Sequence, residues 1–575
     1  MECRWIILLG LYLRLASAVL HTLDPRWPKG TGHRGMPWPL PRKWKESNTL
    51  MTIDPDKFYM WSDIKNCDII DMAFQRYQRY LFEGRRGILS PRYKTMHRLD
   101  VVVSSKTCDY WPRENMDEAY NLTVSYIGFA RVAARTVWGA IRGIETFTQL
   151  IWIDGNGEYM INKTTIEDSP RFAHRGVLID TARHFIPTPI LKLTMDAMSY
   201  NKLNVFHWHM TDDESFPYES KTFPELHEMG AYSIYHTYSP GEITELAEYG
   251  RELGIRIIPE IDSPDHTQSW AKSHPELFTA CQYNDSAADY RPQKELLNPL
   301  EKSTYNFVSW LIWEIAKLFP DHYIHVGLND LDEDCWRSNP NISAYMKRKS
   351  WPLSKVQQQY TNKVLQMAMD EGKKPILWQT PLEKNVKLKF SNVTIQIDKE
   401  LTDDLRETIR NLGYDVIVSA CWDLHHVTYG EDWRNFYECE PENYTGGPLT
   451  DGSILGGEAT IWTQYIDGPN MVPLMWPRAS AMAERLWSPK ETRDIDYALY
   501  RLDEHRCRML RHDVPSQPLT SGYCGEYEFY GWVHSKAASS DRVAYGILYI
   551  MCACIMDLIK DIFTFPSTTN STVES

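Results

Sequence analysis

Five side-chain carboxylates or amides lie within six positions in the stretch from His325 to Trp336, which reads His-Val-Gly-Leu-Asn-Asp-Leu-Asp-Glu-Asp-Cys-Trp. The apolar segment Tyr323 to Gly327, which runs into them, has the composition of a buried strand. Carboxyl groups held at a strand end can give and take protons during a reaction. This stretch is therefore the first candidate for a catalytic site.

The elements that must position it alternate between apolar strands and amphipathic helices from Arg171 onward, a pattern that predicts βα units and a parallel sheet. Eight strands are expected, at 176–180, 205–210, 255–261, 323–327, 375–378, 393–397, 415–419 and 453–457. Helices are expected at 189–200, 242–254, 302–319, 355–371 and 477–487. Eight strands with eight crossovers predict an α/β fold of the (β/α)8 TIM-barrel type over residues 168–525, with a doubly wound open sheet as the alternative.

A barrel of this kind gathers its functional side chains at the carboxyl ends of the strands. The residues that follow the expected strands are Asp180, Arg183, His209, Asp212, Asp213, Glu260, Asp262, His266, Asn329, Asp330, Trp378, Asp398, Trp422, Asp423, Glu458, Trp462 and Gln464. Indole rings stack on the apolar face of a sugar, while acids and amides bond its hydroxyls. We therefore predict a sugar-binding mouth that includes Trp378, Trp422 and Trp462.

Other chemistries fit the sequence less well. His207 and His209 share one face of a strand, as metal ligands do in amidohydrolase barrels, but no histidine follows strands five or six. Both are interpreted as hydrogen-bonded barrel residues, and no metal or other cofactor is expected. Nucleotide fingerprints, phosphate loops and the Gly-Xaa-Ser-Xaa-Gly elbow do not follow any strand. The net charge of -14 gives no basic surface for nucleic acid.

The regions that flank the barrel are less regular. Residues 1–18 have the apolar run and small-residue end of a cleaved secretory signal, with an N-terminal membrane anchor as the alternative. Residues 21–61 show no clear periodicity and are expected to be irregular. Apolar runs at 99–103 and 124–129, with a helical stretch at 130–150, predict a small α+β domain over 19–167. In the tail, 526–575, the apolar run 543–556 is short for a membrane span, so an anchor, an interfacial helix and a packed segment all remain open.

A secretory route gives meaning to two other features. Glycosylation sequons occur at Asn121, Asn162, Asn284, Asn341, Asn392, Asn443 and Asn570. Among eleven cysteines, six can be grouped as the pairs Cys67/Cys108, Cys281/Cys335 and Cys507/Cys524, although the sequence does not fix their connectivity.

Several long motifs carry a resemblance to a known family. They are residues 171–185 (Arg-Phe-Ala-His-Arg-Gly-Val-Leu-Ile-Asp-Thr-Ala-Arg-His-Phe), 201–209 (Asn-Lys-Leu-Asn-Val-Phe-His-Trp-His), 215–218 (Ser-Phe-Pro-Tyr), 223–226 (Phe-Pro-Glu-Leu), 476–479 (Trp-Pro-Arg-Ala) and 483–487 (Ala-Glu-Arg-Leu-Trp). The chain resembles the lysosomal-type β-N-acetylhexosaminidases of glycoside hydrolase family 20 from about residue 100 to Cys524.

The resemblance implies a small α/β domain before a barrel, a homo- or heterodimer, and cleavage of terminal β-linked GlcNAc or GalNAc from glycans. It also implies a lysosomal or extracellular location, with possible membrane association of the tail. The mechanism it implies is substrate-assisted and departs from the usual two-carboxylate scheme. The sugar's acetamido oxygen attacks C1, an Asp orients that group, and the next residue, a Glu, protonates the leaving oxygen.

The family pattern at the fourth strand, His-Xaa-Gly-Gly-Asp-Glu, is altered here. The same spacing places Asn329 at the Asp and Asp330 at the Glu. An amide cannot offset the positive charge that develops on an oxazolinium ion. Asp330 keeps the acid but lies about 1.5 Å further back, one methylene shorter. A register shift that promotes Asp332 and Glu333 would need compensating gaps on both sides.

The remaining family positions divide into two groups. Arg183, Asp212, His266, Trp378 and Trp462 match residues that contact the sugar or, for Asp212 and His266, form the relay behind the acid. The family's Trp, Tyr and Glu after strands six, seven and eight are replaced by Asp398, Asp423 and Gln464, and its Gly before the relay histidine by Asp265. We therefore predict weak or lost hydrolysis, the alternatives being an active enzyme, a non-catalytic glycan binder or adhesion protein, and a partner subunit.

Overall fold

The computed structural model describes residues 34–82, 93–108, 110–154, 158–281, 296–329, 331–426, 431–444, 454–521 and 524. The chain forms two compact units, one of residues 1–31, 153–158 and 521–575 and the other of residues 32–152 and 159–520. The predicted signal at 1–18 and the apolar run at 543–556 lie outside the described residues. In the part of the chain that is described, no helix has both the length and the apolar character needed to cross a bilayer.

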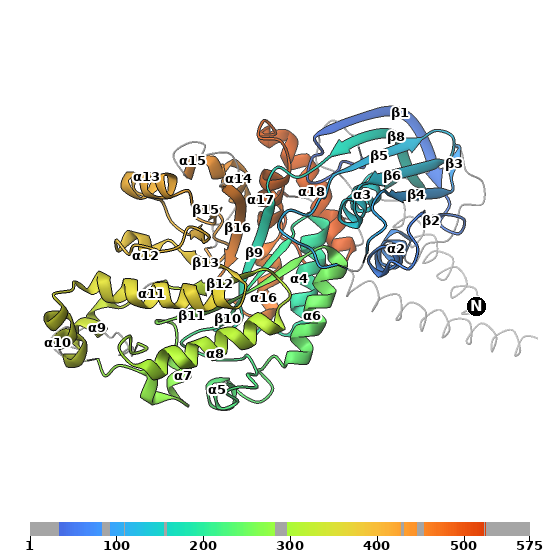
Figure 1. The fold of residues 1–575 in the computed structure, drawn as a ribbon. Coiled ribbons are helices and arrows are strands. Elements are labelled where there is room, and N and C mark those ends of the chain that lie inside the picture. Colours follow the sequence, from blue (N-terminus) through green and yellow to red (C-terminus); the bar gives the residue numbers. More distant parts are fainter. Residues whose placement is uncertain are drawn as a thin grey trace, which may run out of the picture. The chain divides into compact units, whose positions relative to one another are not determined.

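Eight parallel strands close into a barrel within the larger unit (Figure 1). They are β9 (His174–Asp180), β10 (Val205–Thr211), β11 (Arg256–Ser263), β12 (Tyr323–Gly327), β13 (Lys374–Trp378), β14 (Thr394–Ile397), β15 (Asp415–Val418) and β16 (Ile454–Ile461). The barrel closes because β9 pairs with both β10 and β16. The predicted (β/α)8 barrel is thus confirmed and the open sheet excluded.

Helices follow the strands and cover the barrel. The longer ones are α4 (Thr188–Tyr200), α6 (Pro240–Leu253), α8 (Lys302–Leu318), α10 (Pro340–Lys349), α11 (Leu353–Asp370), α13 (Asp403–Leu412), α16 (Gly468–Met475), α17 (Arg478–Trp487) and α18 (Ile495–Arg511). Short turns are α5 (Glu225–Gly230), α7 (Gln268–Ala271), η1 (Pro275–Leu277), α9 (Glu333–Ser338), α12 (Thr380–Glu383), α14 (Trp433–Glu438) and α15 (Pro441–Tyr444). Local sequence fixes their ends: Ser239 and Glu242 form a capping box at the start of α6, and Gly254 ends it in the left-handed region.

The barrel interior changes character along its axis. Near the amino ends of the strands, Val205, Ile258, Tyr323, Ile376 and Ile417 form an apolar layer. Further toward the carboxyl ends the inward side chains are buried histidines and glutamates. Because buried polar groups are costly unless they are bonded, this second layer must be internally paired.

Before the barrel lies an eight-stranded sheet covered by two helices. Its strands are β1 (Lys43–Ile53), β2 (Tyr59–Ser62), β3 (Thr95–Met96), β4 (Arg98–Val103), β5 (Tyr120–Ser125), β6 (Phe129–Ala134), β7 (Trp152–Ile153) and β8 (Tyr159–Asp168), and seven of them run in the order β2-β4-β6-β5-β8-β1-β3. The helices are α2 (Asp68–Phe82) and α3 (Val137–Gln149). A small domain of mixed strands and helices therefore precedes the barrel, as predicted.

Two predictions within this small domain are wrong. The helix expected over 130–150 begins only at Val137, where the Thr136 side chain caps it, and Phe129–Ala134 is a strand with alternating burial. The apolar run at 124–129 accordingly spans the turn between β5 and β6. The segment expected to be irregular contains β1, whose eleven residues pair with β8.

A buried arginine joins this domain to the barrel. Arg142 of α3 bonds Glu118 at 2.9 Å and donates to the backbone oxygens of Leu253 and Gly254. Glu118 also receives two bonds from Arg175 of β9 at 2.7 Å. These charged groups are nearly solvent-free, so each one requires the other.

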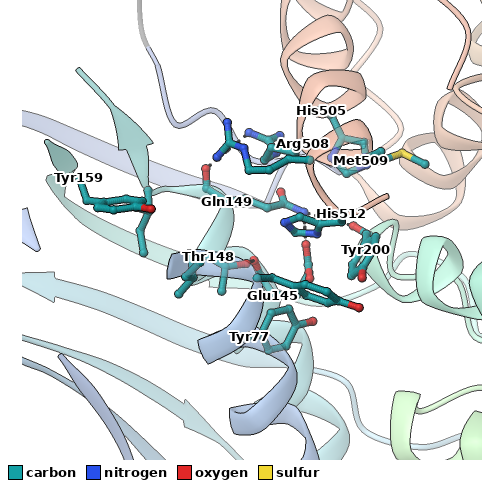
Figure 2. Close-up of a pocket in the computed structure, with 14 residues that line it drawn as sticks. Tyr77, Glu145, Thr148, Gln149, Tyr159, Tyr200, His505, Arg508, Met509 and His512 are labelled. Atoms are coloured by element: carbon teal, nitrogen blue, oxygen red, sulfur yellow. Dashed lines mark hydrogen bonds between the residues drawn. The ribbon is translucent and has the colours of Figure 1, made fainter. Parts of the chain in front are cut away.

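A pocket lies between α2, α3 and α18 (Figure 2). Gln149 donates to Glu145 there at 2.7 Å, and burial raises the pKa of Glu145. Burial, with two neighbouring arginines, lowers the pKa of His512 to about 3. None of the residues that line this pocket follows a barrel strand, so it is not the predicted sugar site.

The disulfides largely follow the predicted grouping. Cys67–Cys108 and Cys281–Cys335 are bonded, and Cys507 and Cys524 both take part in disulfides. A bridge that the grouping missed, Cys421–Cys439, closes a loop after β15. Among the sequons, Asn121, Asn341, Asn392 and Asn443 are exposed, Asn162 is half-buried, and Asn284 and Asn570 lie outside the described residues.

Candidate active site

Three of the predicted sugar-pocket residues meet at the carboxyl ends of β9 to β11. Asp212 lies 2.7 Å from Nη2 of Arg183 and 3.0 Å from Nδ1 of His266. Arg183 also bonds Asp180 at 3.1 Å and approaches Glu214 at 3.3 Å. Arg183, whose side chain is only 9% exposed, is therefore held by three carboxylates, which fixes the direction of its guanidinium.

Backbone bonds set this geometry. Asp180 ends β9, and one of its oxygens accepts the N–H groups of Ala182 and Arg183, which turns the chain sharply. Its other oxygen accepts the N–H of Thr463 after β16. His266 has a left-handed backbone, with φ of 61°, and its N–H donates to Asp265 at 2.8 Å. Asp265 thus supports the turn that carries His266.

The charges in this cluster reinforce one another. Burial alone would lower the pKa of His266, but the adjacent Asp212 raises it to about 10. Burial alone would raise the pKa of Asp212, but His266, His209 and Arg183 hold it far below its usual range. An ionised Asp212 beside a protonated His266 is the state this geometry favours.

A buried glutamate connects the cluster to the barrel interior. Glu260 of β11 bonds Nδ1 of His209 at 2.6 Å, Nδ1 of His325 at 2.9 Å and Nε1 of Trp378 at 2.7 Å. His209 in turn places Nε2 2.7 Å from Asp212. Burial alone would raise the pKa of Glu260, but the imidazoles of His325, His209 and His207 hold it well below its usual range. Glu260 of β11 therefore connects His209, and through it Asp212, to the indole of Trp378.

A second buried carboxylate completes this layer. Glu458 of β16 lies 2.6 Å from Nδ1 of His207 and 2.9 Å from Nε2 of His174, and it accepts from Gln396 at 3.0 Å. Burial would lower the pKa of His207, but Glu458 and Glu260 raise it to about 9. The two histidines of the His207-Trp-His209 pattern are hydrogen-bonded to carboxylates, which is the role the sequence predicted for them.

The indole rings are arranged less uniformly than expected. Trp378 and Trp462 have ring centroids 6.0 Å apart, and the Arg183 guanidinium lies 5.3 Å from the Trp462 ring. Trp422, which was expected in the site, is fully buried and donates to the oxygen of Phe436. It packs on Gly457, where a Cβ would lie only 2.1 Å from its ring. Gly457 precedes the inward Glu458 and so faces outward, which places Trp422 outside the barrel.

The end of β12 shows strain at the altered motif. Gly327 has φ of 64°, and a Cβ there would lie 1.9 Å from Asp262, so glycine is required. Leu328, where the family pattern has its second glycine, also has a left-handed φ of 67° and donates its N–H to Asp262 at 2.8 Å. A leucine in this conformation costs about 1–2 kcal/mol. Burial raises the pKa of the accepting Asp262.

Of the two residues at the catalytic-pair positions, Asn329 is described and Asp330 lies outside the described residues. The Asn329 amide oxygen accepts from the Thr380 hydroxyl at 2.5 Å. Thr380 comes from the start of α12, directly after β13. This bond settles where the amide oxygen points and directs the NH2 group the other way.

Asp398, Asp423 and Gln464, at the three substituted positions, lie among residues other than those of the Arg183 cluster. The backbone N–H of Asp398 donates to Gln379 at 3.1 Å. Asp423 contacts His425 and lies 3.6 Å from Nε2 of His426. Gln464 is exposed beyond β16.

Sequence reasoning missed Glu214, Thr380 and the histidines beside Asp423. The run Thr-Asp-Asp-Glu at 211–214 is a signal for the first of these, because it extends the acidic end of β10. Thr380 carries no such signal. Its role depends on the register between β12 and β13.

The mouth of this closed (β/α)8 barrel joins carboxylate–imidazole pairs to indole rings at the carboxyl ends of the strands, which is where barrel enzymes place their active sites. Residues 172–490 match the pattern described as "Glycosyl hydrolase family 20, catalytic domain", and residues 37–150 match "beta-acetyl hexosaminidase like". The chain belongs to glycosyl hydrolase family 20.

Relatives agree over most of the chain. It is 40% identical to the beta-hexosaminidase subunit beta of Felis catus, over 90% of this chain and 99% of that protein. It is also 40% identical to the subunit alpha of Mus musculus, over 86% of this chain and 95% of the relative. The crystal structure of a Flavobacterium johnsoniae chitobiase superimposes with a TM-score of 0.71 at 26% identity, covering 83% of this chain and 73% of that one.

Proposed function

We propose that this chain recognises terminal β-linked GlcNAc or GalNAc on glycans and hydrolyses them weakly or not at all. One observation carries the proposal: the Arg183–Asp212–His266 cluster is fully assembled, whereas the catalytic-pair positions hold Asn329 and Asp330. A site in this state keeps binding groups and loses reactive ones.

Binding would use groups that are already oriented. Arg183 needs no reorganisation to face a sugar hydroxyl, because its carboxylate partners hold it in place. Trp462 offers an indole face at the mouth, with Trp378 behind it as a buried floor. A pyranose ring with apolar and hydroxyl faces complements this combination.

Asn329 is unsuited to the family's substrate-assisted step. An aspartate would accept the acetamido N–H and offset the positive charge of the cyclic intermediate. The neutral amide carries no negative charge to offset the positive charge of the intermediate, and its oxygen, the only acceptor it has, is turned toward Thr380. Loss of one group that stabilises developing charge typically costs about 10²–10³ in rate.

Asp330 weakens the proton transfer that would follow. Its carboxyl is one methylene, about 1.5 Å, short of the family's glutamate. Displacing a general acid by that distance forfeits much of a contribution worth roughly 10²–10⁴ in rate. The two substitutions act on successive parts of one step, so their effects combine.

Turnover of a chromogenic β-GlcNAc substrate at acid pH tests the reaction. The unaltered chain should be at least about 10²-fold slower than the double variant Asn329→Asp with Asp330→Glu. The single variant Asn329→Asp serves as the control. It should recover only part of the rate gained by the double variant. Rapid turnover by the unaltered chain would instead establish a fully active exo-β-N-acetylhexosaminidase, the alternative that the intact relay favours.

Sugar binding needs a separate measurement, by calorimetry with GlcNAc and GalNAc. Trp462→Ala should weaken binding by roughly 10-fold, equivalent to about 1.4 kcal/mol. Trp310→Ala on α8 is the matched control, since this indole is 54% exposed and lies on a barrel helix rather than at a strand end. Equal loss in both variants, or no binding by the unaltered chain, would contradict the proposal.

We further propose that the chain works as a homo- or heterodimer in the secretory pathway, in a lysosomal or extracellular setting. Its relatives are named as hexosaminidase subunits, and four of its sequons are exposed. Association with a copy of itself or with a related subunit is measured by light scattering on the secreted protein. A strict monomer would contradict the dimer.

A further inference from the structure

A carboxylate and two imidazoles gather at the rim of the barrel, in the loop that follows β15. They are Asp423, His425 and His426, and their ligand atoms all lie within 4.8 Å of one another. Asp423 contacts Nδ1 of His425 with one oxygen and lies 3.6 Å from Nε2 of His426 with the other. The two imidazole rings have centroids 3.9 Å apart.

The backbone beneath these side chains is firmly held. Leu424 and Trp422 exchange backbone bonds with Thr460 of β16, at 2.8 and 2.9 Å. The buried Arg478 donates to the backbone oxygens of Leu424 and His426, at 2.7 and 2.9 Å. These bonds, with the nearby Cys421–Cys439 bridge, pre-organise the loop and so reduce the ordering cost of binding a ligand.

The loop also has a defined direction. Asp423 pairs in parallel with Thr460, two residues after Glu458, whose side chain lies inside the barrel. Side chains on a strand alternate between faces, so Asp423 and Thr460 lie on the inner side. Trp422, the residue before, packs outside. The aspartate therefore faces the mouth, with His425 two residues further on.

We propose that Asp423, His425 and His426 form a binding site for a divalent transition-metal ion, with zinc as the reference ion. Imidazoles with one carboxylate are a ligand set that zinc favours, and three protein ligands leave a further position for water or a sugar oxygen. Ligand atoms around such an ion lie roughly 3.4 Å apart in tetrahedral geometry, given bonds of about 2.1 Å.

Two other clusters of similar composition are less suited to a cation. His207, Glu260 and His325 are buried and bonded within the barrel. Asp212, Asp213 and His266 lie beside Arg183, whose positive charge repels an incoming ion at 2.7 Å from Asp212. At the rim, Arg478 donates to backbone oxygens and lies 3.3 Å from Asp432, and its charge also acts on Asp423 without an ion pair at the 2.7 Å found between Arg183 and Asp212.

The position of the site also points to a part in glycan binding, an inference that rests on the proposed function. Asp423 stands where the family places a sugar-contacting tyrosine. An ion there would lie on the rim of the same pocket and would add a Lewis-acidic partner for a glycan hydroxyl or carboxylate.

Calorimetric titration of the intact, metal-free protein with zinc chloride tests the site without any sugar. We expect His425→Ala with His426→Ala to lower zinc affinity by more than about 100-fold, beyond what loss of an outer partner causes. His322→Ala is the control, because this exposed histidine precedes β12 at the opposite end of the barrel, and it should bind as the unaltered chain does. Unchanged zinc affinity in the double variant would overturn the proposal.

A milder variant guards against loss of fold. Asp423→Asn keeps the shape of the side chain and should still weaken zinc binding and abolish the rise in melting temperature that zinc gives the unaltered chain. A zinc-dependent rise of equal size in both proteins would also overturn the site. Sugar titrations in a chelating buffer report separately on the proposed glycan pocket, so failure of one proposal is not mistaken for failure of the other.

Discussion

The mouth of the barrel has two sides that differ in how their side chains are used. On the side of β9 to β11, Arg183, Asp212 and His266 bond one another and continue through His209 to the buried Glu260. On the side of β14 to β16 lie Asp398, Asp423 and Gln464, at positions where we expect the family pattern to have Trp, Tyr and Glu. We call these the bonded side and the substituted side.

The difference teaches which parts of a binding site are free to vary. A buried ion that loses its partner destabilises the whole fold, whereas a side chain that faces only a ligand can be replaced at little structural cost. The bonded side serves the fold as well as the sugar. Three of the positions that differ from the family pattern, Asp398, Asp423 and Gln464, lie on the substituted side. The others are Asp265 after β11 and Leu328, Asn329 and Asp330 after β12.

The strongest test of the difference between the two sides is to remove one carboxylate from each. Asp212→Asn leaves Arg183, His209 and His266 without their shared anion, so we expect a loss of about 3–5 kcal/mol in the free energy of unfolding. Asp423→Asn should change it by less than about 1 kcal/mol, because the carboxylate is a third exposed. Urea unfolding at neutral pH measures both. Equal losses would show that the two sides do not differ.

The pH dependence of stability gives a second test of how the bonded side is charged. The pKa of His266 is raised to about 10 and that of His207 to about 9, so their stabilising contributions are complete below about pH 6.5 and are lost as the pH rises through 9–10. Burial raises the pKa of Asp262, which adds a decline that starts above about pH 4. Asp212 and Glu458, with lowered pKa values, oppose this only at strongly acid pH.

Because the pKa of His512 is lowered to about 3, that histidine destabilises the fold as the pH drops below about 6.5 and opposes the decline there. We therefore expect the free energy of unfolding to be highest near pH 6.5 and to fall by about 2 kcal/mol or more toward pH 9. Unfolding midpoints measured across this range test the expectation. The variant Asp262→Asn should flatten the first part of the decline and leave the part above pH 8. A stability that increases steadily toward pH 9 would exclude the charge arrangement described for the bonded side.

Restoring the substituted side should act on sugar affinity rather than on stability. Asp398→Trp, Asp423→Tyr and Gln464→Glu together return the family's residues, and we expect GlcNAc to bind about 10- to 100-fold more tightly, or about 1.4–2.7 kcal/mol. Calorimetry on the triple variant measures this, with the unaltered chain as reference. Unchanged affinity would mean that the bonded side already supplies the whole binding energy.

The smallest expected effect compares two adjacent residues. Thr463 follows β16 but is bonded to the other side of the mouth, because its N–H donates to Asp180 and its hydroxyl accepts from the N–H of His184. Thr463→Ala should cost about 1 kcal/mol in the free energy of unfolding. Gln464→Ala, one position further and exposed, should stay within about 0.5 kcal/mol. The difference is measured as a shift in the urea midpoint.

The barrel was predictable because its signals are repetitive. Strand β12 was predicted over its full length, and β9, β10, β11, β13, β14 and β15 to within two residues at either end, since buried parallel strands are apolar runs between amphipathic helices. The small domain was harder. Strand β6 is rich in alanine, which favours helices, and it becomes a strand only through pairing with β4 and β5.

The candidate site was predictable by residue but not by contact. The meeting of Arg183, Asp212 and His266 followed from strand ends that share one mouth. The burial of Trp422 did not, because a tryptophan after a strand faces in or out according to the local register. The hub at Glu260 joins three strands, β10, β12 and β13, and no pattern within one strand encodes it.

The altered motif after β12 also differs in its backbone, at Leu328. Its left-handed backbone and its bond to Asp262 mean that a leucine occupies a turn shaped for glycine, immediately before Asn329. Restoring only the two acidic residues would leave Leu328 in its left-handed backbone conformation. A designed route back to catalysis therefore has three positions, and Leu328→Gly, which contributes no reactive group, belongs to it.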